Sequence, residues 1–216
     1  MKYSVVLFDL DGTLLNTLDD IRDALNRALK KHGMPPRTPE EVRQFVGNGS
    51  ARLIKLAVPA ECGREEADSV LKDYRADYDT HCDVKTRPYD GVTEAMKQLK
   101  KRGCKLAVVS NKPDAAVRLL AEAHFPGLLE SAVGEGNGVR RKPAPDTVLA
   151  ALANMGAKAE DAVYVGDSEV DVATAKNAGL DCVSVCWGFR DRETLIAAGA
   201  EKIIAAPCEL TDIVER

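Results

Sequence analysis

The stretch VVLFDLDGTLLNT, residues 5–17, begins with four apolar residues and then places two aspartates two positions apart. Successive side chains of a strand point to opposite faces, so Asp9 and Asp11 point the same way where the strand leaves the core. Two carboxylates about 4 Å apart repel each other by roughly 4 kcal/mol at an effective dielectric constant near 20. This placement raises the question of what offsets the repulsion.

Apolar segments like this one recur along the chain, and most are separated by stretches with helical periodicity. The predicted strands cover residues 5–10, 105–109, 131–133, 162–165, 182–186 and 202–205. Three of them are nearly continuous apolar runs, which is typical of parallel strands covered on both faces. Helices are predicted over residues 92–102 and 145–155, each followed by a glycine. The pattern predicts an α/β fold, with a Rossmann-like parallel sheet core and helices on both faces.

Residues 15–85 interrupt this alternation, because they carry helical patterns and no strand signal. Apolar residues recur there at helical spacing, and TPEE, residues 38–41, has the sequence of a helix-capping box with proline at the first helical position. We therefore predict an all-helical cap domain over residues 15–85, inserted after the first strand. Residues 1–14 and 86–216 form the predicted catalytic core.

The composition narrows the class of protein. Acidic residues number 34 and basic residues 30, the net charge is −4, and no run of lysine and arginine exceeds three residues. Nucleic acid is not expected as a partner, because binding to its backbone depends on clustered positive charge. No segment approaches the roughly 20 apolar residues of a membrane span, and the N-terminus lacks the pattern of a signal peptide. We expect a cytoplasmic protein, a monomer or homodimer without a membrane partner, whose six scattered cysteines are reduced thiols.

Polar side chains follow the predicted strands at their carboxyl ends, which meet at one edge of a parallel sheet. They are Asp9, Asp11 and Thr13 after the first strand, Ser110 and Asn111 after the second, Lys142 after the third, and Asp167 and Asp171 after the fourth. Taken singly, each has an ordinary structural explanation as a turn former, a helix cap or an exposed residue. Their joint placement at equivalent strand ends instead predicts a functional site.

The chemistry of the predicted site follows from its side-chain types. Several carboxylates at one edge need a cation, and oxygen ligands without histidine or thiolate nearby favour Mg²⁺. A lysine and a serine hydroxyl beside such an ion suit a phosphoryl group. A carboxylate among them can attack phosphorus and form an aspartyl-phosphate.

Four segments of the chain resemble, in their order and separation, the motifs of haloacid dehalogenase-like phosphatases with a helical cap. They are DLDGT (9–13), VVSNK (108–112), RKPAP (141–145) and GDSEVD (166–171). The resemblance implies that Asp9 is the nucleophile and that Asp11 is the acid and base. It implies further roles for the rest: Thr13, Ser110, Asn111 and Lys142 at the phosphoryl group, and Asp9, Asp11 through its backbone carbonyl, Asp167 and Asp171 around Mg²⁺. Whether Asp171 contacts the ion directly is left open.

The cap stretch VGNGSARL, residues 46–53, is similar to one in phosphoglycolate phosphatases. The resemblance implies hydrolysis of a small phosphorylated metabolite, first of all 2-phosphoglycolate, with Gly49 letting the backbone approach it. A plain turn between two helices, with Ser50 as the helix cap, is the alternative interpretation. Pyrophosphate, sugar phosphates and nucleoside monophosphates stay open as substrates. Two other functions stay open as well: a β-phosphoglucomutase-like isomerase, which uses the same motifs, and a receiver-type signalling domain, which lacks the cap and the acid at Asp11.

Overall fold

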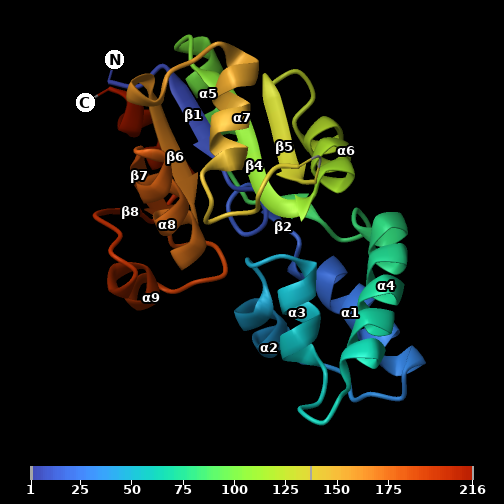
Figure 1. Ribbon diagram of the computed structural model, residues 1–216. Coiled ribbons are helices and arrows are strands. Elements are labelled where there is room, and N and C mark those ends of the chain that lie inside the picture. The colour runs from blue at the N-terminus through green and yellow to red at the C-terminus, as the bar shows by residue number, and fades with distance from the viewer. Residues whose placement is uncertain (1, 137, 216) are drawn as a thin grey trace. The chain divides into compact units, whose positions relative to one another are not determined.

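The computed structural model describes residues 2–136 and 138–215 (Figure 1). The chain packs as two compact units. The core unit combines Met1–Leu15 with Pro88–Arg216, and the helical unit is Asn16–Arg87. Among the described residues, no helix is both long enough and apolar enough to cross a bilayer.

A six-stranded parallel sheet forms the centre of the core unit (Figure 1). Its strands, in spatial order, are β5 (Ser131–Glu135), β4 (Lys105–Pro113), β1 (Val5–Phe8), β6 (Ala162–Gly166), β7 (Asp181–Val185) and β8 (Lys202–Ile204). Every neighbouring pair is parallel, and Phe8 of β1 lies level with Val108 and Val165. The predicted α/β class with a parallel sheet is confirmed.

The alternation of side chains along β1 divides the core into two layers. Val6 and Phe8 pack on one face with α5 (Val92–Lys101), α6 (Asp114–His124) and the 3₁₀ helix η2 (Pro207–Val214). Val5 and Leu7 pack on the other face with α7 (Asp146–Met155) and α8 (Glu169–Ala178). Two short helices, η1 (Ala159–Asp161) and α9 (Arg192–Ala197), complete the unit. The sheet is therefore covered on both faces, as the apolar strands predicted.

The sheet has its topological switch point beside β1. From β1 the chain continues to β4 on one side, whereas from β6 it continues through α8 to β7 on the other side. Ligands of open parallel sheets bind at the carboxyl ends of strands where the connections diverge in this way. The carboxyl ends of β1 and β6 are thus the expected place for a site.

The end of β4 differs from its prediction. The sequence predicted a strand over residues 105–109, but β4 runs to Pro113 and includes Ser110, Asn111 and Lys112. Polar residues there suggested a loop, yet the pairing with β5 resumes at Pro113 and Glu135 after a register shift. The parallel partner, rather than local polarity, sets the end of this strand.

The helical unit contains α1 (Leu18–Lys31), α2 (Pro39–Phe45), α3 (Ser50–Ala57) and α4 (Arg64–His81). The predicted capping box begins α2: the Thr38 hydroxyl accepts from the Glu41 N–H at 3.2 Å, and the Thr38 N–H donates to the Glu41 carboxylate at 2.8 Å. Two-residue strands β2 (Leu15–Asn16) and β3 (Arg87–Pro88) pair as a separate small sheet. Helices thus dominate this part of the chain.

Gly49 is the N-cap of α3, at φ +79° and ψ 164°. The alternative interpretation placed Ser50 at the cap, but Ser50 is the first residue of the helix. Its hydroxyl accepts a hydrogen bond from Arg75 Nε at 3.0 Å. The stretch is therefore a turn between α2 and α3, and the predicted ligand contact of Gly49 stays a prediction.

Candidate active site

Asp9 directly follows β1 and is fixed there by β6. Its backbone N–H donates to the carbonyl of Val165 at 2.9 Å, next to the last paired residues of the two strands. The residue is only 7% exposed, and its Oδ1 lies 2.7 Å from the Nζ of Lys142. The switch point of the sheet thus presents a nearly buried carboxylate that is paired with a cation.

Lys142 is buried with its ammonium group among acidic and hydroxyl oxygens. Its Nζ donates to Asp9 at 2.7 Å, to Asp171 at 2.8 Å and to the Tyr164 hydroxyl at 3.0 Å. Burial alone would lower the pKa of Lys142, but the two carboxylates raise it above its ordinary value. The lysine therefore keeps its positive charge at neutral pH.

Asn111 holds the backbone of Lys142 in place. Its Oδ1 accepts from the Lys142 N–H at 2.7 Å, and its Nδ2 donates to the Lys142 carbonyl at 3.0 Å. All of these groups are buried, so each lost hydrogen bond would leave a costly unsatisfied group. The end of β4 therefore positions the segment that carries the catalytic lysine candidate.

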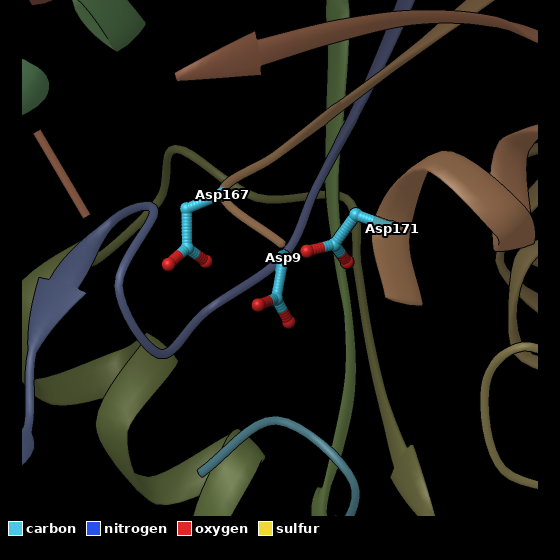
Figure 2. A group of neighbouring side chains, drawn as sticks. All are labelled: Asp9, Asp167 and Asp171. Carbon is cyan, nitrogen blue, oxygen red and sulfur yellow. The ribbon is translucent and has the colours of Figure 1, made fainter. Parts of the chain in front are cut away.

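Asp167 and Asp171 bring two further carboxylates next to Asp9 (Figure 2). Asp167 follows β6, Asp171 lies in the first turn of α8, and one oxygen of each of the three lies within 4.8 Å of the others. Asp171 accepts four hydrogen bonds: from the Ser168 N–H and hydroxyl at 3.0 and 2.6 Å, from Lys142 at 2.8 Å and from Tyr164 at 2.9 Å. Its hydrogen-bonding capacity is therefore well used within the protein.

The three carboxylates differ in how well the protein stabilises their charge. Burial raises the pKa of Asp9 to about 7, although Lys142 opposes the rise. Burial, together with the charges of Asp171 and Asp9, raises the pKa of Asp167 well above its usual range. Burial acts in the same direction on Asp171, but Lys142 and the hydrogen bonds from Ser168 and Tyr164 lower its pKa overall. Asp9 and Asp167 are thus the two carboxylates that need more positive charge.

This electrostatic pattern fits a divalent cation. Four carboxylates (Asp9, Asp11, Asp167 and Asp171) face two buried lysines (Lys112 and Lys142), which leaves an excess of two negative charges. Arg190 also acts on Asp167, but its charge is offset by its own ion pair with Glu169. An ion of charge +2 would balance this excess, and oxygen ligands suit a hard cation. The residues present therefore match a carboxylate metal site.

Asp11 and Lys112 form a second ion pair at this edge of the sheet. Lys112 Nζ lies 2.9 Å from Asp11 Oδ1, and the two side chains are 4% and 14% exposed. The Ser110 hydroxyl oxygen accepts from the Lys112 N–H at 3.3 Å, so the end of β4 also orders this serine. The acid candidate is therefore held by a lysine other than Lys142.

The loop after β7 contacts both the β1 loop and Asp167. The Phe189 N–H donates to Asp167 Oδ2 at 2.7 Å, and the Thr13 hydroxyl donates to Oδ1 at 3.2 Å. Trp187 Nε1 donates to the Thr13 carbonyl at 3.0 Å. A Cβ atom on Gly188 would lie 2.4 Å from both the Asp167 Cβ and the Gly12 carbonyl oxygen. The close packing here requires a glycine.

Residues 6–185 match the family of haloacid dehalogenase-like hydrolases. The match includes every carboxylate and both lysines of the site. The chain belongs to this family. Its Asp9, Asp11, Lys142 and Asp167 are thereby placed in a hydrolase fold whose motifs the sequence predicted.

The relatives of this chain in the haloacid dehalogenase-like family include phosphatases. A phosphoglycolate phosphatase of Cereibacter sphaeroides is 39% identical over 193 residues, which cover 86% of each chain. An N-acetylmuramic acid 6-phosphate phosphatase of Pseudomonas aeruginosa is 31% identical over 100% of this chain and 96% of its own. A crystal structure from Lactobacillus delbrueckii subsp. bulgaricus, provisionally assigned as a phosphoglycolate phosphatase, has a TM-score of 0.95 at 36% identity, with 99% of each chain covered. The predicted family and the predicted phosphatase class are confirmed.

The predicted core residues of this haloacid dehalogenase-like chain all lie at the carboxyl edge of its sheet. They are Asp9, Asp11, Thr13, Ser110, Asn111, Lys142, Asp167 and Asp171. Gly49, the remaining predicted residue, belongs to the helical unit. The individual roles of these residues stay predictions. The side-chain amide of Asn111 forms hydrogen bonds with the backbone of Lys142, in addition to its predicted contact with the phosphoryl group.

Sequence reasoning missed several members of the site. Lys112 is the last residue of the quoted VVSNK motif, so its position was visible but its role was not. Ser168 and Asp171 have the spacing of a capping box, which could have predicted their hydrogen bonds. Tyr164 lies inside a buried strand, where no local pattern distinguishes it from a core aromatic.

Proposed function

We propose that this protein is a Mg²⁺-dependent phosphomonoesterase that acts through an aspartyl-phosphate on Asp9, with 2-phosphoglycolate as its first candidate substrate. The observation that carries the proposal is the placement of Asp9 at the switch point, paired with Lys142 and lacking full charge compensation. A phosphate ester is an anion and therefore repels an attacking carboxylate. Cations at the site are required to offset this repulsion.

Asp9 and Asp167 are the side chains that would hold the ion, because burial raises the pKa of both. Asp171 would act mainly by orienting Lys142, since it already accepts four hydrogen bonds. The bound cation would supply positive charge opposite the phosphoryl oxygens. Mg²⁺ is proposed over softer ions because every candidate ligand is a hard oxygen.

The first half of the proposed reaction transfers the phosphoryl group to Asp9. A carboxylate oxygen of Asp9 forms a bond to phosphorus while the bond from phosphorus to the ester oxygen breaks. The leaving oxygen keeps that electron pair and takes a proton from the Asp11 carboxyl group. Lys142 balances the negative charge beside Asp9 throughout, and the Thr13 and Ser110 hydroxyls are proposed to donate to phosphoryl oxygens.

The second half releases phosphate. The Asp11 carboxylate takes a proton from a water molecule, whose oxygen then forms a bond to phosphorus. The bond between Asp9 and phosphorus breaks, and its electron pair returns to the Asp9 carboxylate. Inorganic phosphate leaves, and Asp11 is protonated again, now with the proton that it took from the water.

The candidate substrate comes from the relatives. Several are phosphoglycolate phosphatases that cover most of this chain, which supports 2-phosphoglycolate. The relative that covers the full chain acts on N-acetylmuramic acid 6-phosphate, which supports a sugar phosphate as the second candidate. The helical unit is proposed to act as a cap that reads the organic part of the substrate.

Two variants test the covalent mechanism. Asp9→Asn should lower kcat by roughly 10⁴-fold or more with every phosphate ester, because an amide cannot form the acyl phosphate. Asp11→Asn should lower kcat by about 10²- to 10⁴-fold and should leave the nucleophile intact. Phosphate release from a panel of phosphorylated metabolites measures both effects.

Mass spectrometry of acid-quenched protein separates the two steps. We expect a phosphorylated adduct on Asp11→Asn protein and none on Asp9→Asn protein. Substantial turnover by Asp9→Asn would contradict the mechanism. An isomerised phosphate ester in place of free phosphate would instead indicate a mutase.

A further inference from the structure

Lys112 has no role in the reaction as proposed above, yet it is one of two buried lysines at the site. It lies one residue before the carboxyl end of β4, and its side chain is 4% exposed. Its Nζ lies 2.9 Å from Oδ1 of Asp11, the proposed acid and base. Removing an ammonium group from water costs several kcal/mol, so its position calls for an explanation.

The two lysines contact the two aspartates that act on opposite sides of phosphorus in the proposed reaction. Lys142 contacts Asp9, on the side of the nucleophile. Lys112 contacts Asp11, which must reach the leaving oxygen. Because the leaving oxygen is bonded to the organic part of the substrate, the charge of Lys112 lies where the first atoms of that organic part must be.

We propose, on the basis of the phosphatase function above, that Lys112 is a specificity-determining residue that binds an anionic group bonded to the ester carbon. In such a substrate, an oxygen of the anion lies about 3 to 4 Å from the ester oxygen, as bond lengths dictate. A carboxyl on Asp11 and an ammonium on Lys112 that are 2.9 Å apart can therefore contact the two oxygens together. The lysine carries three donors on a rotatable stem, which suits this shared contact.

The arrangement distinguishes between the substrates of the relatives. The carboxylate of 2-phosphoglycolate is bonded directly to the ester carbon and fits Lys112. A hexose 6-phosphate has an uncharged ring carbon at that place and would leave the lysine without an added anion. Lys112 therefore favours 2-phosphoglycolate, and it does so from the core unit.

Three small substrates that differ in one group test the proposal. These are 2-phosphoglycolate, 2-hydroxyethyl phosphate and phosphoethanolamine, which carry an anionic, a neutral and a cationic group at the same place. The wild-type enzyme with Mg²⁺ should show the highest kcat/KM for 2-phosphoglycolate. In Lys112→Met, kcat/KM should fall for all three, but at least about tenfold more for 2-phosphoglycolate, mainly through KM, since a charge-assisted hydrogen bond is lost.

The ratio of kcat/KM for phosphoethanolamine to that for 2-phosphoglycolate should rise in Lys112→Met, which partial misfolding cannot produce. Lys105→Met is the matched control, because Lys105 begins the same strand and donates to the Met155 carbonyl at 2.7 Å, away from the site. It should leave the ratio unchanged. Equal loss on all three substrates in Lys112→Met would overturn the proposal.

Binding without turnover separates this proposal from the phosphatase function. Asp9→Asn protein with Mg²⁺ is titrated calorimetrically with 2-phosphoglycolate, and the titration is repeated with Lys112→Met added. The second variant should bind at least about tenfold more weakly, whereas inorganic phosphate should bind the two alike. Equal affinities for 2-phosphoglycolate would overturn the role of Lys112. Absence of phosphate release from any ester by the wild-type enzyme would instead refute the proposed function, and the titration would still decide on Lys112.

Discussion

Lys142 shows how far the chemistry of one residue depends on its neighbours. Its charge is kept by Asp9 and Asp171, and its main chain is held by both ends of the Asn111 amide. A lysine on a flexible stem loses much conformational freedom in such a site. Fixing the peptide groups on both sides of the Lys142 Cα lowers the further cost of ordering the side chain. Asn111 is thus expected to matter for catalysis through Lys142.

Replacing Asn111 by alanine tests this dependence. Two buried backbone groups lose their partners, so the free energy of unfolding should fall by about 1 to 3 kcal/mol. We expect kcat to fall at least about tenfold with little change in the amount of folded protein, because the Lys142 ammonium is no longer held against Asp9. Thermal unfolding and steady-state kinetics measure the two effects.

Asn154→Ala is the control for this variant, because the exposed Asn154 also donates a side-chain hydrogen bond, to the Ser131 hydroxyl away from the site. It should lower stability without a matching loss of kcat. A similar kcat for Asn111→Ala and Asn154→Ala would show that the Asn111 amide is not needed to position Lys142.

The backbone conformation of Gly49 is enough by itself to explain why a glycine occupies this position. At φ +79° and ψ 164°, its backbone adopts a conformation that is essentially restricted to glycine. Any side chain there would strain the turn between α2 and α3 by about 1 to 3 kcal/mol, with or without a ligand. A loss of activity on substitution would therefore not by itself establish a substrate contact.

At the scale of elements, the loop from Cys186 to Arg190 determines where Asp167 can lie. The loop supplies the Phe189 N–H, and it approaches so closely at Gly188 that a methyl group has no room. The atoms in conflict would be the Gly12 carbonyl and the Asp167 side chain, of which the first belongs to the backbone. The loop after β7 thus locks the loops after β1 and β6 together.

Gly188→Ala should accordingly lower the affinity of the site for Mg²⁺ in protein that remains folded. We expect the free energy of unfolding to fall by about 1 to 3 kcal/mol through overpacking. The concentration of Mg²⁺ that gives half-maximal activity should rise several-fold, because Asp167 must move. Gly63→Ala is the control, since a Cβ there meets nothing within 4 Å. An unchanged Mg²⁺ requirement in folded Gly188→Ala protein would contradict this role of the loop.

The elements also show what the sequence can and cannot predict. The six strands of the main sheet were predictable because short apolar segments mark them, and the carboxylates were predictable because they follow such segments at one edge. The two-residue strands β2 and β3 were not predicted. The end of β4 was predicted wrongly, since SNK resembles a loop while its strand continues to Pro113. The loop after β7 was missed because it acts through an N–H group and through the absence of a side chain at Gly188. Such contributions leave no signature in residue type or spacing.

At the scale of the whole molecule, the excess negative charge of the site couples folding to pH and to metal. The pKa of Asp9 rises from 3.8 to about 7 on folding, and the pKa of Asp167 is also raised. Between pH 3.8 and about pH 7, Asp9 is therefore protonated to a greater extent in the folded state than in the unfolded chain. Stability from this source is therefore fully present below about pH 4 and is lost as the pH rises through about 7.

Thermal unfolding at two pH values measures this coupling. In the presence of a chelator, Tm should fall between pH 6 and pH 8, by several degrees if the effect amounts to about 1 to 2 kcal/mol. Mg²⁺ should raise Tm at both pH values and should raise it more at pH 8, because it replaces protons that are then absent.

The Asp9→Asn variant provides the control for the pH effect, since an amide does not titrate. Its increase in Tm with Mg²⁺ should differ less between pH 6 and pH 8 than that of the wild-type protein. An increase that is the same at both pH values in the wild type would show that the carboxylates are not short of positive charge.

Trp187 is the single tryptophan of the chain, and its indole N–H is bonded to the carbonyl of Thr13. All indole fluorescence of the protein therefore originates beside the loop that carries Asp11. Emission from an indole depends on its hydrogen bonding and on nearby charge, so events at this loop alter the signal directly. The protein carries an intrinsic optical reporter of its own reaction centre, and rapid-mixing experiments can follow ligand arrival and phosphoryl transfer without an attached dye.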